Sequence, residues 1–316
     1  MKRILITGAS GFIGRNLFER LSERSDFEVW GTYNTRKFSD SPRLIKADLT
    51  QKETVKDITK GFDVMIHAAS VTSGAKDIRE RPYIHVTDSM IMNTLLLEAC
   101  YTNAIPQGVF LSCTILYPMN REQPVKEEDF DHSQIHPIYL GGAMMKVALE
   151  TLTKFYTNLK KTKFTVVRHS NMYGPHDKYD LEKSHMFGAN VTKVMTAPEG
   201  GTITVWGEGR EKRDLLYIAD LVDFVELVID KQNWDHEIFN VGLSEAYPVR
   251  DVIAKIVEAS GKNIKLEFDS SKPTLPVSVS LDISKAKSIV GWVPKITLGE
   301  GIKKTLAWYA SNIKKP

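Results

Sequence analysis

Short runs of apolar residues alternate with segments of helical periodicity through the first half of the chain. Most of the apolar runs are rich in β-branched residues, which is typical of strands covered on both faces of a parallel sheet. The segments between them place apolar residues three and four positions apart, as on one face of a helix. The pattern predicts strands at 4–7, 27–32, 63–67, 108–112 and 164–168, and helices at 12–24, 89–102 and 141–159.

This alternation of strands and helices predicts an α/β protein with a Rossmann-type, doubly wound parallel sheet. After about Tyr173 the alternation becomes less regular and loop residues are more frequent. We therefore expect a first domain at 1–172, with a return to it around 205–230. A smaller, mixed α/β C-terminal lobe is expected at 173–316.

Composition narrows the class of protein. The 316 residues include 42 Lys plus Arg and 39 Asp plus Glu, a net charge of +3, which disfavours nucleic acid as a partner. With 42% hydrophobic and 26% charged residues, the chain is typical of a globular protein and not of a disordered one. The two cysteines exclude a disulfide framework and a four-cysteine zinc site, and the eight histidines show no metal-ligand spacing. No metal site is expected.

The start of the chain and its apolar runs bear on localisation. Gly8 interrupts the first apolar run before a signal-peptide core is complete. No run approaches the ~18–20 apolar residues that a membrane-spanning helix needs. We expect a cytoplasmic protein without a membrane partner.

A glycine-rich turn lies between the first strand and the first helix, with the sequence Gly8-Ala9-Ser10-Gly11-Phe12-Ile13-Gly14. Glycines at this place allow a tight turn and let the backbone approach a pyrophosphate closely. The phosphates then meet the partial positive charge of the helix N-terminus. The turn therefore predicts a dinucleotide-binding site, with Gly8, Ser10, Gly11, Phe12, Ile13 and Gly14 at the cofactor.

The ends of the next strands indicate which dinucleotide binds. NAD sites usually carry an acidic residue after the second strand to hold the ribose 2′-hydroxyl. Here Asn34 and Arg36 follow that strand and no carboxylate does, so NADP is favoured over NAD; the alternative is that Arg36 is a solvated loop charge. Asp48 and Leu49 are expected at the adenine. Ala68 and Ala69, after strand 63–67, are expected beside the cofactor.

Further segments follow one another in a recognisable order: Asp48-Leu49, His67-Ala68-Ala69, 168–175, Arg213-Asp214, Asn240-Val241-Gly242 and Gly291-Trp292-Val293-Pro294. With the glycine turn, they resemble the extended short-chain dehydrogenase/reductases, the NAD-dependent epimerase/dehydratase family, over essentially the whole chain. Within that family the chain is most similar to the GDP-L-fucose synthase group, through the segments 111–118, 171–177, 184–185, 206–213 and 269–273.

The resemblance implies a reaction. A hydride passes between the cofactor, NAD(P), and a sugar carbon, usually C4, of a nucleotide-linked sugar, here a GDP-sugar, in surface-polysaccharide or deoxysugar biosynthesis. A tyrosine is the base, a lysine four residues later lowers its pKa and holds the nicotinamide ribose, and a Ser or Thr shares the hydrogen bond. The C-terminal lobe is then the nucleotide-sugar lobe. The family also implies a homodimer through helices 89–102 and 141–159.

The sequence departs from the family at the tyrosine. Lys146 suits the family lysine, but Gly142 occupies the tyrosine position. Tyr139 is seven residues before Lys146, about 10.5 Å along a regular helix, which is too far for direct contact. If the two glycines delay the start of the helix, Tyr139 folds back toward Lys146. Otherwise another group moves the proton.

The hydroxyl position is altered too. The family serine falls on Cys113, with Ser112 before it, as a cofactor contact, and Thr114 after it. Thr114 can donate and accept the hydrogen bond. Cys113 is either a proton carrier or a small buried residue at a strand end. The residues 114–116 supply no carboxylate pair, which disfavours 4,6-dehydration.

Substrate contacts follow from the same resemblance. Arg213 stands where the family holds the nucleotide diphosphate, and Asn171 is a sugar or phosphate donor or a loop cap. His185 matches the histidine of an epimerase Cys–His pair, whereas Ile115 replaces its cysteine. We therefore favour oxidation or reduction at C4. The alternatives are a 3,5-epimerase/4-reductase and a cofactor-binding protein without catalysis that serves as a sensor or assembly partner.

Overall fold

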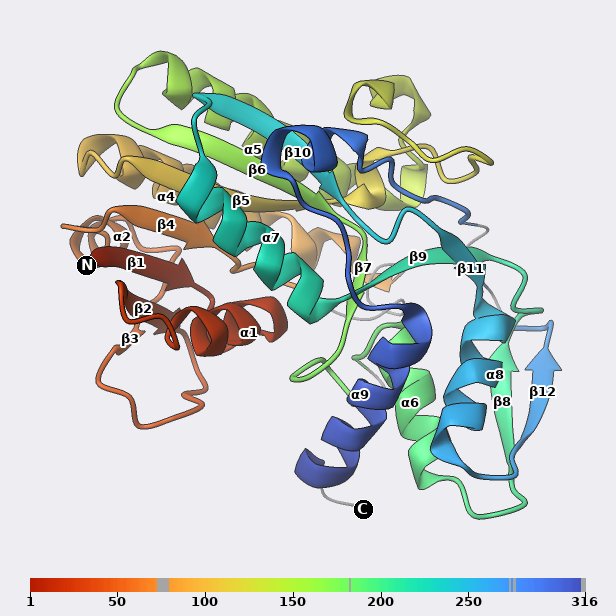
Figure 1. The fold of residues 1–316 in the computed structure, drawn as a ribbon. Helices are drawn as coiled ribbons and strands as arrows, with labels where there is room; N and C mark the ends of the chain where they lie inside the picture. Colours follow the sequence, from red (N-terminus) through yellow and green to blue (C-terminus); the bar gives the residue numbers. More distant parts are fainter. Residues whose placement is uncertain (73–79, 182, 273, 275–276, 314–316) are drawn as a thin grey trace.

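The computed structural model describes residues 1–316 except 73–79, 182, 273, 275–276 and 314–316. Its largest element is a parallel sheet of seven strands, with the order β10-β6-β5-β4-β1-β2-β3. The strands are β1 (Lys2–Thr7), β2 (Phe27–Tyr33), β3 (Leu44–Lys46), β4 (Val64–His67), β5 (Gln107–Cys113), β6 (Lys163–His169) and β10 (His236–Val241). Helices cover both faces (Figure 1). The Rossmann-type doubly wound fold predicted from the sequence is confirmed.

The two faces of the sheet have separate cores. On one face, α1 (Phe12–Leu21) and α7 (Ile218–Lys231) pack through Leu17 and Phe224 against Ile4 and Ile6. On the other, Leu5 belongs to the core under α2 (Lys52–Ile58), α4 (Thr87–Thr102) and α5 (Leu140–Asn158). Successive side chains of a strand point to opposite faces, so a continuous apolar run such as that of β1 supplies both cores.

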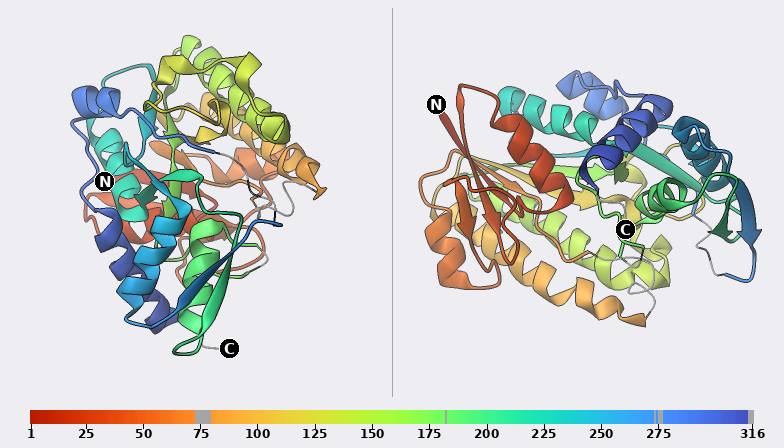
Figure 2. Two further views of the ribbon diagram at one scale, coloured as in Figure 1. Left: turned by 90° about the vertical axis from the view of Figure 1, so that its right-hand side faces the viewer. Right: turned by 90° about the horizontal axis from the view of Figure 1, so that it is seen from below.

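The second lobe is smaller and lies beside the carboxyl ends of the large sheet (Figures 1 and 2). Its strands form a three-stranded sheet of β7 (Asn171–Tyr173), β9 (Lys212–Tyr217) and β11 (Ala246–Pro248), and a pair of β8 (Thr202–Trp206) and β12 (Lys265–Asp269). Its helices are α6 (Met186–Thr196), α8 (Val249–Ser260) and α9 (Leu298–Asn312). A core that includes Tyr173, Phe187 and Ile302 joins them.

Short helical segments connect these elements. The 3₁₀ helices are η1 (Pro82–His85), η2 (Thr114–Leu116), η3 (Glu127–Asp129), η4 (His132–Gln134) and η5 (Pro137–Tyr139), and η6 (Ala286–Val290) is a π-helix. The chain after residue 172 contributes to both lobes. Besides forming the smaller lobe, it supplies α7, which covers the large sheet, and β10, which pairs with β6. Within the described residues, no helix is long and apolar enough to cross a membrane.

Candidate active site

The glycine turn is built for close backbone approach. Gly8 has a φ of +76°, and a Cβ on it would lie 2.7 Å from the Cα of Ala69. A Cβ on Gly14 would lie 2.2 Å from the carbonyl oxygen of Gly8. Gly11 caps helix α1 without a side-chain hydrogen bond, so the first amides of the helix remain free for an anion. These features fit the pyrophosphate of a dinucleotide.

A cavity of about 250 Å³ opens directly on this turn. Its lining includes the predicted cofactor residues Gly8, Ser10, Gly11, Asn34, Asp48, Leu49, Ala68 and Ala69. Phe12 and Ile13 instead pack onto the sheet core in the first turn of α1. Sequence reasoning missed other lining residues, namely Thr32, Tyr33, Ala47, Thr50, Val71, Asp88 and Met92. Thr32 and Tyr33 end β2, and this position at the carboxyl end of a strand was the available signal.

The side of the cavity near β2 carries the groups expected at the adenosine. The Thr32 hydroxyl accepts a hydrogen bond from the Gly8 amide at 3.0 Å, which ties β2 to the turn. Asp48 accepts bonds from the amide and hydroxyl of Thr50, and these bonds lower the pKa of Asp48. Arg36 lies on the exposed loop after β2, and its guanidinium has no partner among the described residues. It is therefore free to meet a phosphate.

Lys146 lies on α5 and is not among the residues that line this cavity. Its ammonium donates a hydrogen bond to the Leu111 carbonyl at 2.8 Å. Burial lowers the pKa of Lys146, while Cys113 and Glu150 act in the opposite direction. An ammonium held at the end of β5 in this way lies where a parallel sheet presents its carboxyl edge to a ligand.

A buried network fixes the helix that carries Lys146. Glu150, one helical turn further on, forms a two-point ion pair with Arg168, with Nε–Oε1 and Nη2–Oε2 distances of 3.0 and 2.7 Å. Ser112 donates its hydroxyl to Glu150 at 2.7 Å and is fully buried. The Ser112 side chain, predicted at the cofactor, is thus engaged in the contact between β5 and α5.

The glycines at the start of α5 are helical. The helix begins at Leu140, so it is not delayed by Gly141 and Gly142, and Tyr139 stands before its first turn as the cap residue. A Cβ on Gly142 would lie 3.2 Å from Cδ1 of Ile115. Tyr139 interacts electrostatically with Arg213, which lies in the smaller lobe. Its role as the proton carrier stays a prediction.

The ends of β5 and β6 bring further groups to this position. Cys113 pairs with His169 across the two strands, and Thr114 begins η2 directly after Cys113. Burial raises the pKa of the Cys113 thiol, with Lys146 opposing the rise. The Thr114 hydroxyl has no hydrogen-bond partner among the described residues. His169 was not singled out from the sequence, because only the register of two strands distant in sequence brings it to Cys113.

His185 approaches from the smaller lobe. It caps the N-terminus of α6, and its side chain is exposed. Desolvation, together with the nearby Lys178 and His85, lowers the pKa of His185. His185 also acts electrostatically on His169, as Lys146 does from α5. The site therefore lies between the two lobes.

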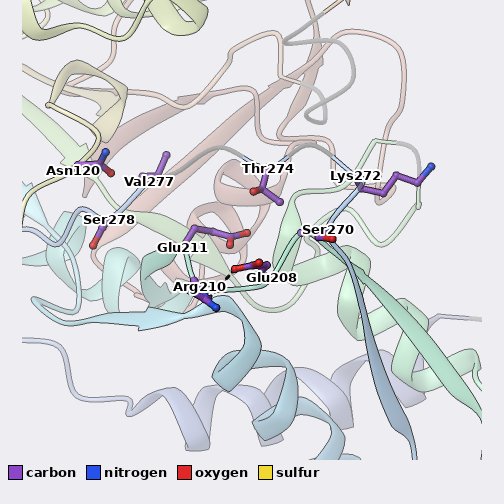
Figure 3. A pocket seen from close by; sticks show the side chains of 10 residues that line it. Asn120, Glu208, Arg210, Glu211, Ser270, Lys272, Thr274, Val277 and Ser278 are labelled. Atoms are coloured by element: carbon purple, nitrogen blue, oxygen red, sulfur yellow. Dashed lines mark ion pairs between the residues drawn. The ribbon is translucent and has the colours of Figure 1, made fainter.

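Arg213 is bonded to Val277, a residue that lines a second cavity of about 550 Å³ (Figure 3). The guanidinium donates from Nη1 to the carbonyls of Lys212 and Val277, and Val277 and Glu211 line the cavity. Burial lowers the pKa of Arg213, while Glu211 and Tyr139 oppose this. Asn171 donates to the Asp214 carbonyl at 3.1 Å, beside Arg213 in the chain.

Asp214 connects two of the segments on which the family resemblance rests, Arg213-Asp214 and Asn240-Val241-Gly242. Its buried carboxylate accepts hydrogen bonds from the amides of Leu243, Ser244 and Leu281. It thereby joins the chain after Asn240-Val241-Gly242 to the segment 277–281 beside Arg213. In the part of the chain that the structure describes, no three His, Cys, Asp or Glu side chains are grouped as metal ligands.

A parallel sheet with a glycine turn, a cofactor cavity and a lysine at the strand ends defines a Rossmann-type enzyme that binds a dinucleotide. The model of the NAD dependent epimerase/dehydratase family matches residues 4–242. The chain belongs to this family, and it is therefore an enzyme rather than a non-catalytic binding protein.

Individual relatives agree with this assignment. GDP-L-colitose synthase of Yersinia pseudotuberculosis is 28% identical over 98% of both chains. GDP-L-fucose synthase of Escherichia coli strain K12 is 24% identical over 98% of this chain and 97% of the relative. The structure of UDP-glucose 4-epimerase of Thermotoga maritima, solved with UDP-glucose, has a TM-score of 0.85 at 24% identity and covers 99% of this chain and 100% of that chain. The last comparison supports the fold.

Proposed function

We propose that this enzyme is an NAD(P)-dependent oxidoreductase that acts at C4 of a nucleotide-linked sugar, preferably a GDP-linked sugar. The observation that carries the proposal is that Lys146 of α5, bonded to the Leu111 carbonyl, and His185 of the smaller lobe both act electrostatically on His169 at the end of β6. Arg213 of the smaller lobe likewise interacts with Tyr139, just before α5. The cofactor supplies the hydride acceptor or donor. Two relatives with coverage of at least 97% are named as synthases of GDP-linked sugars, which favours GDP over UDP.

The side chains have distinct roles in this proposal. Lys146 holds the nicotinamide ribose, and Thr114 hydrogen-bonds the reacting sugar hydroxyl. Arg213 holds the diphosphate, since a guanidinium matches two phosphate oxygens at once. Asn171 and His185 contact the sugar from the smaller lobe. The sequence offers Tyr139 and Cys113 as candidate proton carriers, and the structure adds His169, which stands in register with Cys113.

NADP is the preferred cofactor in this proposal. The support is the exposed Arg36, which has no partner among the described residues, and the lack of a carboxylate in the segment 31–37. A ribose 2′-phosphate at this place would gain a charge-assisted hydrogen bond.

The test uses the purified enzyme. Binding of NADP and NAD is measured first by calorimetry, and absorbance at the reduced-nicotinamide band is then followed with GDP-, UDP- and dTDP-linked sugars. We expect turnover with a GDP-sugar and weaker turnover with the others. Binding of neither cofactor, or no turnover with any nucleotide sugar, would contradict the proposal.

An epimerase is the second candidate function. His185, exposed at the start of α6 and with a lowered pKa, is suited to move a proton at a sugar carbon. Its cysteine counterpart in the family is replaced by Ile115, which is why we place this function second. Uptake of solvent deuterium at C3 or C5 would establish it.

We further propose a homodimer that forms through α4 and α5. Leu140, Met144 and Phe155 of α5 and Ile91 of α4 are large apolar side chains exposed to solvent. Leu140 and Met144 are four residues apart and share a helix face. A stripe of this kind on two adjacent helices is typical of a protein–protein interface.

A further inference from the structure

The position where the family carries its tyrosine has no group that can transfer a proton. Gly142 supplies no side chain, and its nearest neighbour on that side is the apolar Ile115. Lys146, one helical turn after Gly142, is oriented by the Leu111 carbonyl of β5. A proton that leaves a sugar hydroxyl here must therefore go to a group on another element.

His169 supplies such a group at the end of β6. It is half-buried and pairs in register with Cys113, so both residues stand at the carboxyl edge of the sheet, where Lys146 and Thr114 also lie. Its Nδ1 donates to the Ser170 carbonyl at 2.8 Å, since a carbonyl only accepts. The lone pair of the neutral ring is then on Nε2, which has no partner among the described residues.

His67, a fully buried histidine at the end of β4, has no such unpartnered ring nitrogen. His67 is bonded on both ring nitrogens, to the Thr7 hydroxyl and to Oδ1 of Asn93, each at 2.8 Å. It has no free lone pair to offer. Tyr139 lies before the first turn of α5 and interacts with Arg213 in the smaller lobe, while burial raises the pKa of the Cys113 thiol and weakens it as a base. His169 is the group whose tautomer and place both suit a base.

We propose that His169 Nε2 is the proton acceptor that replaces the family tyrosine. This inference rests on the proposed function at C4. In the oxidation, the C4 hydrogen leaves as hydride to the nicotinamide ring of NAD(P)⁺, and the hydroxyl proton passes to Nε2. The products are the 4-ketone, the reduced cofactor and an imidazolium, which loses its proton to solvent. In the reduction each transfer is reversed.

The charges around His169 suit this role. Burial, together with Lys146 on α5 and His185 at the start of α6, lowers the pKa of His169 to about 4. Burial also raises the pKa of Cys113, its register partner on β5, although Lys146 and the adjacent Arg168 oppose that rise, so this neighbour is a neutral thiol. The imidazole is therefore neutral at physiological pH. As the hydride departs, the hydroxyl oxygen takes on the character of a protonated ketone and becomes strongly acidic. Even a weak base accepts its proton at that stage.

The test compares His169→Gln and His169→Ala with the wild type and with Tyr139→Phe and Cys113→Ser. A matched control is His236→Gln, because His236 begins β10, at the amino end of the sheet and away from the strand ends that carry Cys113 and His169, and is bonded to Thr153. We expect kcat for His169→Gln to fall at least ~100-fold, with the dissociation constant of the cofactor within about twofold of wild type. Tyr139→Phe and Cys113→Ser should each lower kcat by much less.

Chemical rescue separates a proton carrier from a structural residue. Imidazole added to His169→Ala should restore turnover in proportion to the concentration of its neutral form, and should not affect His169→Gln. The wild type should show no loss of kcat/KM as pH falls from 9 to 6. A His169→Gln enzyme with wild-type kcat, or absence of rescue in a variant that still binds cofactor, would overturn the inference alone. Absence of turnover by the wild type with every nucleotide sugar would overturn the proposed function together with it.

Discussion

Glu150 and Arg168 form a buried, two-point ion pair that fastens α5 to β6, with their side chains 7% and 4% exposed. The Arg168 guanidinium also donates to the Tyr117 hydroxyl and to the Glu127 carbonyl. The pair thus stands at the centre of a network that spans β5, β6 and the loop 117–130. Because Lys146 is one turn from Glu150 on the same helix, this network sets the position of the Lys146 ammonium.

We predict that Glu150→Ala lowers the free energy of unfolding by ~3–5 kcal/mol, because it leaves the Arg168 charge buried without a partner. Chemical denaturation measures the change. The double variant Glu150→Leu/Arg168→Met should lose less, since no charge is then buried. The exposed pair Lys60–Asp57 is the control, and Lys60→Ala should cost less than ~1 kcal/mol. Equal losses in Glu150→Ala and Lys60→Ala would contradict the prediction.

The arrangement of the first lobe followed from local signals in the sequence. Strand β1, the turn at Gly8 and helix α1 are adjacent in the chain, and each has its own pattern: a buried apolar run, a glycine that needs positive φ and a helical periodicity. The predicted strand 164–168 and helix 141–159 differ from β6 and α5 by one residue at each end. Patterns of this kind do not depend on distant contacts.

The chemistry of the site depended on contacts that no local pattern encodes. Cys113 and His169 are neighbours only through the register of β5 and β6. Ser112 is a polar residue at a strand end, which predicted a cofactor contact, but its hydroxyl bonds to Glu150 across a helix–sheet interface. Tyr139, just before α5, interacts electrostatically with Arg213 of β9, more than 70 residues further along the chain. Tertiary packing decided each of these.

Arg36 provides a test of cofactor preference. Its guanidinium is exposed and has no partner among the described residues, so Arg36→Ala should leave the free enzyme unchanged. We predict that the dissociation constant of NADP rises ~10–100-fold, in line with the loss of a hydrogen bond to a charged group, whereas that of NAD changes little. Isothermal titration calorimetry with both cofactors gives the two values. Lys37→Ala is the matched control, since Lys37 is next in the chain and lies 3.9 Å from Asp40. The same loss for NAD as for NADP would argue against a 2′-phosphate contact.

Asp177 should make stability depend on pH. Its Oδ2 is buried without a hydrogen-bond partner among the described residues, and burial raises the pKa of Asp177 to about 7. An unfolded Asp has a pKa near ~3.9, so between pH 4 and 7 the folded protein holds this proton and the unfolded chain does not. The free energy of unfolding therefore falls as pH rises through that window, by on the order of 3 kcal/mol from this group.

The variant Asp177→Asn removes that titration. We expect its free energy of unfolding, measured by chemical denaturation at pH 5 and pH 8, to fall less between the two values than that of the wild type. Asp40→Asn, at a fully exposed loop carboxylate, should retain the wild-type pH dependence. If Asp177→Asn and the wild type lose the same amount, Asp177 is ionised in the folded protein at pH 5.

The apolar stripe on α5 gives a test of the dimer. Phe155 and Met144 are 53% and 41% exposed, large values for residues of their size on a helix that packs against α4. In a twofold-symmetric interface each substitution occurs once in each subunit, so an introduced charge destabilises the interface twice. We predict that Met144→Glu/Phe155→Glu raises the dimer dissociation constant at least ~100-fold, as followed by light scattering after size-exclusion chromatography. Leu181→Glu is the control, because Leu181 is 57% exposed but lies in the loop before α6. A dimer that survives the double substitution on α5 would have to use another surface.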